Sequence, residues 1–244
     1  MYKDFARLYD ELMDDFDYEN WFSYIKDIFN KYKIRPKTVL EMACGTGNLS
    51  LNLAKEEYKL TCFDLSDEML SIAQKKLKGF RNVKLFKQDM TEFNLKTKYD
   101  CILSICDSIN YILDEGSLEA VFKNVYDHLE DDGMFIFDIN SMYKIKDIIG
   151  NNIFIEDRDD IFYIWDNKFD EETNICDFLL TFFYEDGDGL FRRADEFHQE
   201  RAYSVNQIKE ALEKSAFKSI DVYEAFTFSE IKDNSERINF VVRK

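Results

Sequence analysis

Hydrophobic residues at the start of the chain recur every three or four positions, which is the spacing of an amphipathic helix. Residues 1–33 therefore predict two short helices before the core. The apolar positions that define them are Leu8, Tyr9 and Leu12, and then Trp21, Phe22, Ile25, Ile28 and Phe29. Pro36 ends the second pattern, because proline cannot donate a backbone hydrogen bond and disfavours helix in the residue before it.

Short apolar runs alternate with helical patterns from Thr38 to Asp138. Strands are expected at residues 38–40, 58–63, 83–86, 99–105 and 133–138, and helices at 48–55, after Ser66, and at 118–129. The strand patterns are apolar on both faces, so helices must cover both sides of the sheet that they form. This order predicts a doubly wound α/β fold with a mostly parallel, Rossmann-like sheet.

Strand patterns separated by Asp, Glu, Asn and Gly follow residue 150, with no helical pattern between them. They lie at 154–155, 162–165, 167–170, 177–184 and 191–197 and predict an antiparallel β meander. Ser204 and Gln207 then form a capping-box pattern, and residues 217–225 and 237–243 return to strand patterns. The expected domains are N-terminal lid helices (1–33), a core (34–148 and 202–244) and an inserted cap (149–201).

Composition and charge exclude several classes of protein. A chain of 244 residues with 45% hydrophobic content can bury a core for one globular domain with an elaboration. The formal net charge of −17 opposes binding to nucleic acids, whose phosphates require clustered Lys and Arg. The first residues lack the apolar segment of a signal peptide, and no uncharged apolar run approaches the ~20 residues of a membrane helix. We therefore expect a cytoplasmic protein with no nucleic-acid or membrane partner.

The sequence predicts no metal site. The five cysteines form no C-x-x-C pair and the chain has two histidines, so zinc has little support and buried, reduced thiols are expected. Acidic segments at 157–160 and 186–188 resemble carboxylate clusters, but they fall at turn positions, where Asp forms local hydrogen bonds.

Polar residues follow the predicted strands at their carboxyl ends, where doubly wound sheets bind ligands. The first strand leads into Glu41 and a turn with Gly45 and Gly47, which permit backbone angles closed to other residues. Asp64 ends the second strand, 19 residues after Gly45, and is placed to accept hydrogen bonds from both hydroxyls of a ribose. Asp89, after the third strand, suits an adenine amino group. These residues predict a site for an adenosine-containing cofactor.

The glycine pattern distinguishes between two such cofactors. A dinucleotide fingerprint needs G-x-G-x-x-G/A, with a pyrophosphate at the helix N-terminus. Here the third position is Ser50 and the loop holds no Lys or Arg, while Glu41 and Asp64 favour a cation such as a sulfonium or an ammonium. A methyl donor is therefore favoured. A nicotinamide-dependent oxidoreductase and a non-catalytic cofactor-binding protein stay open as alternatives.

The segments Glu41-Met42-Ala43-Cys44-Gly45-Thr46-Gly47, Asp64 and Gln88-Asp89-Met90 resemble the cofactor site of class I S-adenosylmethionine-dependent methyltransferases. Ala43 stands where that family often has its first glycine, and the predicted N-terminal helices resemble the lid of small-molecule members. The resemblance implies S-adenosylmethionine as cofactor, S-adenosylhomocysteine as product and, from a reversed final hairpin, a seven-stranded sheet. The cofactor-binding residues that it implies are Tyr9, Glu41, Ala43, Cys44, Gly45, Gly47, Asn48, Asp64, Leu65, Met69, Asp89, Met90 and Cys106.

Methyl transfer is an in-line displacement that depends mainly on alignment, and the predicted acceptor is a nitrogen or oxygen atom of a small molecule. His198 is a candidate general base because its ordinary pKa lies near neutrality, and Arg201 is a candidate for binding an acceptor carboxylate. The alternatives are that His198 is packed in the fold or faces solvent, and that Arg201 pairs with a surface acid. The candidate acceptor-binding residues are Trp21, Asn110, Tyr111 and Trp165, and the expected assembly is a monomer or a homodimer.

Overall fold

Two helices precede the first strand in the computed structural model, which describes residues 3–12, 16–158, 160–185 and 189–244. They are α1 (Lys3–Leu12) and α2 (Tyr18–Lys31), as the hydrophobic spacing predicted. The chain then alternates strand and helix through β1 (Thr38–Met42), α3 (Asn48–Lys55), β2 (Lys59–Asp64), α4 (Asp67–Lys76), β3 (Val83–Lys87), β4 (Tyr99–Ser104), α5 (Glu115–His128) and β5 (Leu129–Asn140). The alternating order predicted from the sequence is confirmed.

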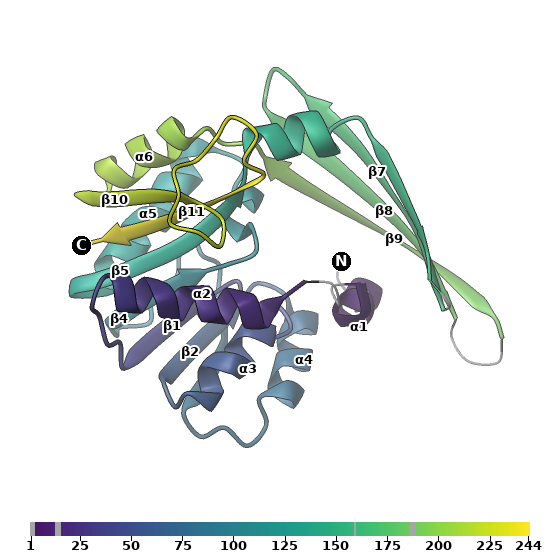
Figure 1. Ribbon diagram of the computed structural model, residues 1–244. Coiled ribbons are helices and arrows are strands. Elements are labelled where there is room, and N and C mark those ends of the chain that lie inside the picture. Colours follow the sequence, from purple (N-terminus) through teal and green to yellow (C-terminus); the bar gives the residue numbers. More distant parts are fainter. Residues whose placement is uncertain (1–2, 13–15, 159, 186–188) are drawn as a thin grey trace.

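A mostly parallel sheet of seven strands, in the order β10-β11-β5-β4-β1-β2-β3, forms the centre of the core (Figure 1). β11 (Arg237–Arg243) runs antiparallel to both of its neighbours, β5 and β10 (Ser219–Glu224). Leu40 and Phe135 face one apolar layer with α5 and α6 (Val205–Lys214), and Val39 and Ile136 face the other with α2 and α3. Both faces of the sheet are therefore buried, as the doubly wound fold requires.

Short polar side chains fix the helix starts that the sequence indicated. Ser66 accepts a hydrogen bond from the backbone N–H of Met69 at 3.2 Å, and Ser204 forms a full capping box with Gln207 at the start of α6. Both helices therefore begin within one or two residues of the predicted positions. Within the described ranges, no helix is long and apolar enough to cross a membrane.

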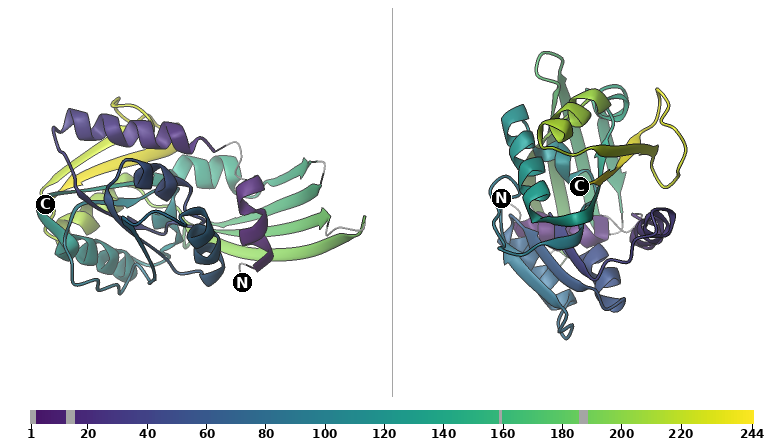
Figure 2. Two further views of the ribbon diagram at one scale, coloured as in Figure 1. Left: turned by 90° about the horizontal axis from the view of Figure 1, so that it is seen from below. Right: turned by 90° about the vertical axis from the view of Figure 1, so that its left-hand side faces the viewer.

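A separate antiparallel sheet, here called the cap, is inserted between β5 and α6. Its strands are β6 (Ile153–Asp157), β7 (Ile161–Asp170), β8 (Ile175–Glu185) and β9 (Phe191–Arg201). Figure 2 shows the cap extending away from the core, with α1 lying beside it. The prediction of two strands at 162–165 and 167–170 is wrong: the exposed Asp166 stays in register with Leu179, so β7 is continuous.

A helical turn at Lys144–Ile149, which the sequence analysis did not anticipate, joins the core to the cap. Ile145 and Ile149 of this turn are buried against Phe169 and Phe178 of the cap strands. The apolar contact holds the base of the cap against the core, at the edge where the parallel strands end.

Candidate functional site

A cavity of about 760 Å³ lies between the carboxyl ends of the parallel strands and the inner face of the cap. The loops after β1, β2, β3 and β4 supply one wall, α1 supplies Tyr9 and Leu12, and β7, β8 and β9 supply the opposite wall. This volume lies in the range of small-molecule sites. The position at the strand ends is the one that the fold predicts for a ligand.

The loop after β1 has an unusual backbone. Ala43, Gly45 and Gly47 all adopt left-handed angles, with φ of 50°, 53° and 80°. A Cβ at Gly47 would lie 3.2 Å from the Cβ of Ala73 in α4, so a side chain there would crowd the helix. The loop therefore turns sharply and stays bare, which leaves Gly45 on the cavity wall while Gly47 packs against α4.

Glu41, at the end of β1, lines the cavity and is almost fully buried. Its Oε2 accepts hydrogen bonds from the Ser50 hydroxyl and, at 3.6 Å, from the Cys62 thiol. Burial raises the pKa of Glu41 to about 7, because removal from water disfavours the charged form. A cationic group bound in the cavity would stabilise the carboxylate.

Asp64 connects the glycine loop to the start of α4. Its Oδ2 accepts the backbone N–H of Gly45 at 2.8 Å, and its Oδ1 accepts that of Ser66 at 2.9 Å. Burial raises the pKa of Asp64, and the two N–H groups oppose this effect. Asp89, after β3, accepts hydrogen bonds from the Thr91 hydroxyl and backbone N–H through Oδ1. Both carboxylates are thus held in place on the cavity wall.

The loop after β4 is held by a charged network. Cys106 and Asp107 adopt left-handed backbone angles, with φ of 64° and 53°, which are costly for residues other than glycine. Asp107 Oδ1 accepts a hydrogen bond from Arg237 at 2.7 Å, and the buried Asp138 accepts one from the same guanidinium. Asp138 also accepts the backbone N–H of Asp107 at 3.0 Å. These contacts offset the backbone strain and fix the end of β4 against the cavity.

α1 is tied to the glycine loop through one carboxylate. Asp10 accepts hydrogen bonds from the Thr46 hydroxyl at 2.6 Å, from the Asn48 amide at 3.0 Å and from Lys76 at 2.9 Å. The sequence analysis noted that no base lies in the loop itself, and the structure adds that Lys76 reaches it from α4. Because Asp10 neutralises Lys76, the loop gains no unpaired cation that could hold a pyrophosphate.

The cap wall combines aromatic and titratable side chains. His198 and Glu200 of β9 line the cavity, and the His198 ring lies 6.2 Å from that of Tyr111 in an edge-to-face arrangement. Burial lowers the pKa of His198, so the imidazole is neutral at pH 7. Trp165 of β7 also lines this wall.

Most of the sequence-predicted site residues come together around this cavity. Those on its wall are Tyr9, Glu41, Ala43, Cys44, Gly45, Asn48, Asp64, Leu65, Met69, Asp89, Met90, Cys106, Tyr111, Trp165 and His198. Their individual roles in binding stay predictions.

Three residues predicted to bind the acceptor, Trp21, Asn110 and Arg201, lie off the cavity wall. Trp21 is fully buried and packs against Phe226, with ring centroids 4.7 Å apart. Asn110 is also fully buried and donates to the backbone carbonyls of Asn140 and Arg201, so it joins the core to β9. The side chains of Trp21 and Asn110 therefore stabilise the fold and do not reach the cavity.

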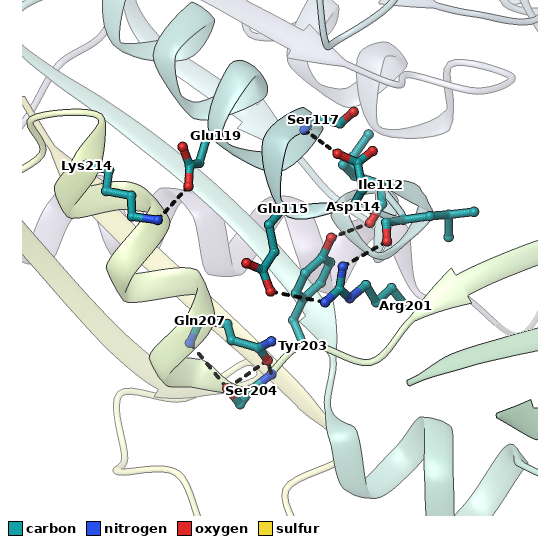
Figure 3. A network of polar contacts seen from close by, with 11 residues as sticks. Ile112, Asp114, Glu115, Ser117, Glu119, Arg201, Tyr203, Ser204, Gln207 and Lys214 are labelled. Atoms are coloured by element: carbon teal, nitrogen blue, oxygen red, sulfur yellow. Dashed lines mark hydrogen bonds and ion pairs between the residues drawn. The ribbon is translucent and has the colours of Figure 1, made fainter. Parts of the chain in front are cut away.

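Arg201 points toward the start of α5 rather than toward the cavity (Figure 3). Its guanidinium donates to the carbonyl of Leu113 at 2.9 Å and to Glu115 at 3.2 Å. The expectation that it binds an acceptor carboxylate therefore gives way to the alternative of a structural ion pair.

The wall also carries polar residues that the sequence analysis did not assign to the site, among them Tyr18 and Glu200, whereas Asp107 lies on it as expected from its place after the fourth strand. Tyr18 shares a 3.4 Å hydrogen bond with Tyr9, which joins α2 to α1. Glu200 could have been found from the alternation of a strand, since it lies two residues after His198 and must face the same side.

Among the residues that the structure describes, no group of three His, Cys, Asp or Glu side chains could hold a metal ion. Asp159 and the acidic segment at 186–188 lie outside these residues.

Comparisons with known proteins agree with this geometry. A family model described as a methyltransferase domain matches residues 39–133. A protein of Geobacillus sp. (strain WCH70), named provisionally as a methyltransferase, is 35% identical over 245 residues, which cover 100% of this chain and 99% of the relative. The crystal structure of an S-adenosylmethionine-dependent methyltransferase from Clostridium acetobutylicum ATCC 824 is 37% identical, with a TM-score of 0.90 over 99% of this chain and 98% of that chain.

The name of a further relative includes its substrate. The dTDP-3-amino-3,4,6-trideoxy-alpha-D-glucopyranose N,N-dimethyltransferase of Streptomyces venezuelae is 30% identical over 120 residues, or 49% of each chain.

Proposed function

Because this chain belongs to the class I S-adenosylmethionine-dependent methyltransferases, we propose that it methylates a nitrogen or oxygen atom of a small molecule bound between the strand ends and the cap. The observation that carries the proposal is the single cavity that joins the glycine loop to the inner face of the cap. The glycine loop and the acids of the strand ends line the part that suits the cofactor, and the cap side chains line the part left for an acceptor.

The residues of the wall fit S-adenosylmethionine. Gly45 leaves its backbone bare, Glu41 and Asp64 supply negative charge, and no Lys or Arg is among the described residues of the wall to attract a pyrophosphate instead. In our proposal Glu41 and the loop hold the amino acid end, Asp64 the ribose hydroxyls and Asp89 the adenine amino group. Leu65 and Met90 would cover the faces of the adenine, and Cys106 would lie beside the sulfonium.

When bound, the cofactor supplies an activated methyl group on a sulfonium, so the protein has little covalent chemistry to perform. Its residues position the acceptor, exclude water and receive a proton. Tyr9, from the helix that Asp10 holds to the glycine loop, and the cap strands help to enclose the cavity. The buried His198 is neutral at pH 7, as a general base requires, and we keep it as a candidate for that role.

The division of the chain follows from this proposal. We propose residues 1–33 as lid, 34–148 and 202–244 as cofactor-binding core, and 149–201 as acceptor-binding cap. The amino sugar named for the Streptomyces venezuelae relative supports a small-molecule acceptor. Cytoplasmic location and a monomeric or homodimeric state stay predictions.

Thermal unfolding with each cofactor tests the proposal. A ligand at 100 times its dissociation constant stabilises the native state by about 2.7 kcal/mol, so saturating S-adenosylmethionine should raise the melting temperature and NAD should leave it unchanged. The reverse pattern would support the nicotinamide-dependent alternative. Formation of S-adenosylhomocysteine with a panel of small amines and alcohols then distinguishes an enzyme from a protein that only binds the cofactor.

A further inference from the structure

The wall of the cavity is acidic. Among the described residues that line it, the carboxylates are Glu41, Asp64, Asp89, Asp107, Asp114 and Glu200, and no Lys or Arg is present. Two cations near this region are paired, Arg237 with Asp107 and Asp138, and Lys76 with Asp10. Lys144 lies off the cavity wall, and its charge interacts with those of Asp107 and Glu200. The wall itself would therefore repel an acceptor that carries phosphates and attract an organic cation.

Glu200 is the member of this set that the cap contributes. It is 4% exposed, and its Oε2 accepts a hydrogen bond from the Asn140 amide at 3.1 Å. The described part of the chain supplies no hydrogen bond to Oε1, although the side chain lines the cavity. The carboxylate can therefore accept a further hydrogen bond from a donor on a ligand in the cavity.

The position of Glu200 places its carboxylate near the end of β4. Asn140 ends β5, and Asn110, just after β4, donates to the backbone carbonyls of Asn140 and Arg201. β9 is thereby held against the strand ends, and the charge of Glu200 interacts with that of Asp107. Asp107 directly follows Cys106, the residue that we place beside the sulfonium.

Apart from His198, the remaining cap wall is apolar or aromatic. Tyr163 and Trp165 of β7 and Phe178, Leu180 and Phe182 of β8 face the cavity. Such side chains pack against a hydrocarbon or aromatic body and attract an ammonium group through their ring faces. One end of the acceptor space is therefore apolar, and the end beside the β4 loop carries a carboxylate.

We propose that the acceptor is an amine without phosphate groups, with its nitrogen bound by Glu200 and its apolar body against the cap. This inference rests on the proposed function and names the substrate class for the same cavity. The proposed acceptor class excludes nucleotide-linked amino sugars, because their negatively charged diphosphate would have to lie in an acidic cavity.

The chemistry requires one proton to leave before transfer. An ammonium R–NH3+ gives a proton to the Glu200 carboxylate, and the freed lone pair of R–NH2 attacks the methyl carbon. The nitrogen–carbon bond forms as the carbon–sulfur bond breaks, and that electron pair stays on sulfur. Burial and the neighbouring Asp107 raise the pKa of Glu200 above its usual range, against the attraction of Arg237 and Lys144, which makes this carboxylate a stronger base than one in water.

Sinefungin provides the test, because this cofactor analogue carries an ammonium group where S-adenosylhomocysteine has a bare sulfur. Calorimetry should give wild-type protein an affinity for sinefungin about tenfold or more above that for S-adenosylhomocysteine. Glu200→Gln should lose most of this preference and still bind S-adenosylhomocysteine, which also establishes that the variant is folded. The matched control is Glu196→Gln, a buried acid on the same face of β9 that is not on the cavity wall. This control should keep the preference.

A second experiment tests whether the cavity excludes ligands that carry phosphate groups. Millimolar thymidine diphosphate should leave the melting temperature of the protein loaded with S-adenosylhomocysteine unchanged, and saturable binding of this probe would overturn the inference. An unchanged sinefungin preference in Glu200→Gln would overturn it as well. Failure of the wild type to bind S-adenosylhomocysteine would instead refute the proposed function, so the two failures are distinguishable.

Discussion

Replacement of Asp64 by alanine tests the orientation of the cofactor. In the structure both carboxylate oxygens accept backbone N–H groups, from Gly45 and Ser66, and each oxygen has a second lone pair for a ribose hydroxyl. Hydrogen bonds to a charged group contribute about 1.5–3 kcal/mol each, and part of the loss is recovered by water in the variant. We therefore expect Asp64→Ala to weaken cofactor binding by about 2–4 kcal/mol, or about 30- to 1,000-fold.

A helix-end charge would produce a much smaller effect, and Asp67 provides the matched control. Asp67 lies in the first turn of the same helix, its side chain is 70% exposed and it pairs with Lys87 rather than lining the cavity. Asp67→Ala should therefore change cofactor affinity by less than about 1 kcal/mol, the scale of a charge near a helix terminus. Isothermal titration of S-adenosylhomocysteine measures both variants.

The apo stability of Asp64→Ala must be measured beside its affinity, because the substitution also removes the acceptor for two backbone N–H groups. Asp64→Asn keeps one acceptor oxygen and should fall between wild type and alanine. If Asp64→Ala and Asp67→Ala weaken binding equally, by less than about 1 kcal/mol, the reasoning that gives Asp64 the ribose is refuted.

Three further predictions concern the lid, the buried acid and the glycine loop. Asp10→Ala removes the acceptor that holds α1 to Thr46 and Lys76, so proteolysis of the N-terminal helix in the cofactor-bound protein should accelerate about tenfold; an unchanged rate would contradict a lid held by Asp10. Burial raises the pKa of Glu41 from 4.5 to about 7, so the folded state binds this proton more tightly and the free energy of unfolding should fall as pH rises between these values. The full contribution is about 3 kcal/mol, and denaturant titrations should show a shallower fall in Glu41→Gln than in wild type; equal slopes would refute it. Gly47→Ala should lower the free energy of unfolding by about 1–3 kcal/mol, and by more than Gly45→Ala, since a Cβ at Gly45 meets nothing within 4 Å; the opposite ranking in urea would contradict the crowding against Ala73.

The sequence was sufficient for the parts of the fold that depend on local physics. Ser66 and Ser204 marked helix starts because their side chains bond to N–H groups three residues away. Apolar runs marked the buried strands of the core because burial removes their apolar side chains from water. The acids at the strand ends were placed correctly relative to one another, because the carboxyl ends of parallel strands meet at one edge of the sheet.

The errors arose where a distant segment decides the surroundings of a side chain. Helical spacing put Trp21 on an apolar face, but Phe226, far along the sequence, is what covers it. Arg201 appeared free to bind a ligand, but the start of α5 lies within reach of its guanidinium. Glu200 was overlooked because an acid in a strand usually faces water, and its burial follows from how β9 docks onto β5.

The central claim is that this cavity binds the methyl donor with its adenosine at the ends of β2 and β3 and its sulfur at the end of β4. A crystal structure of the protein with S-adenosylhomocysteine tests it most directly. We predict ribose hydroxyls within hydrogen-bonding distance of Asp64, the adenine amino group at Asp89, and the sulfur beside Cys106 with open space toward Glu200. A ligand bound outside this cavity, or a ribose turned away from Asp64, would contradict the account.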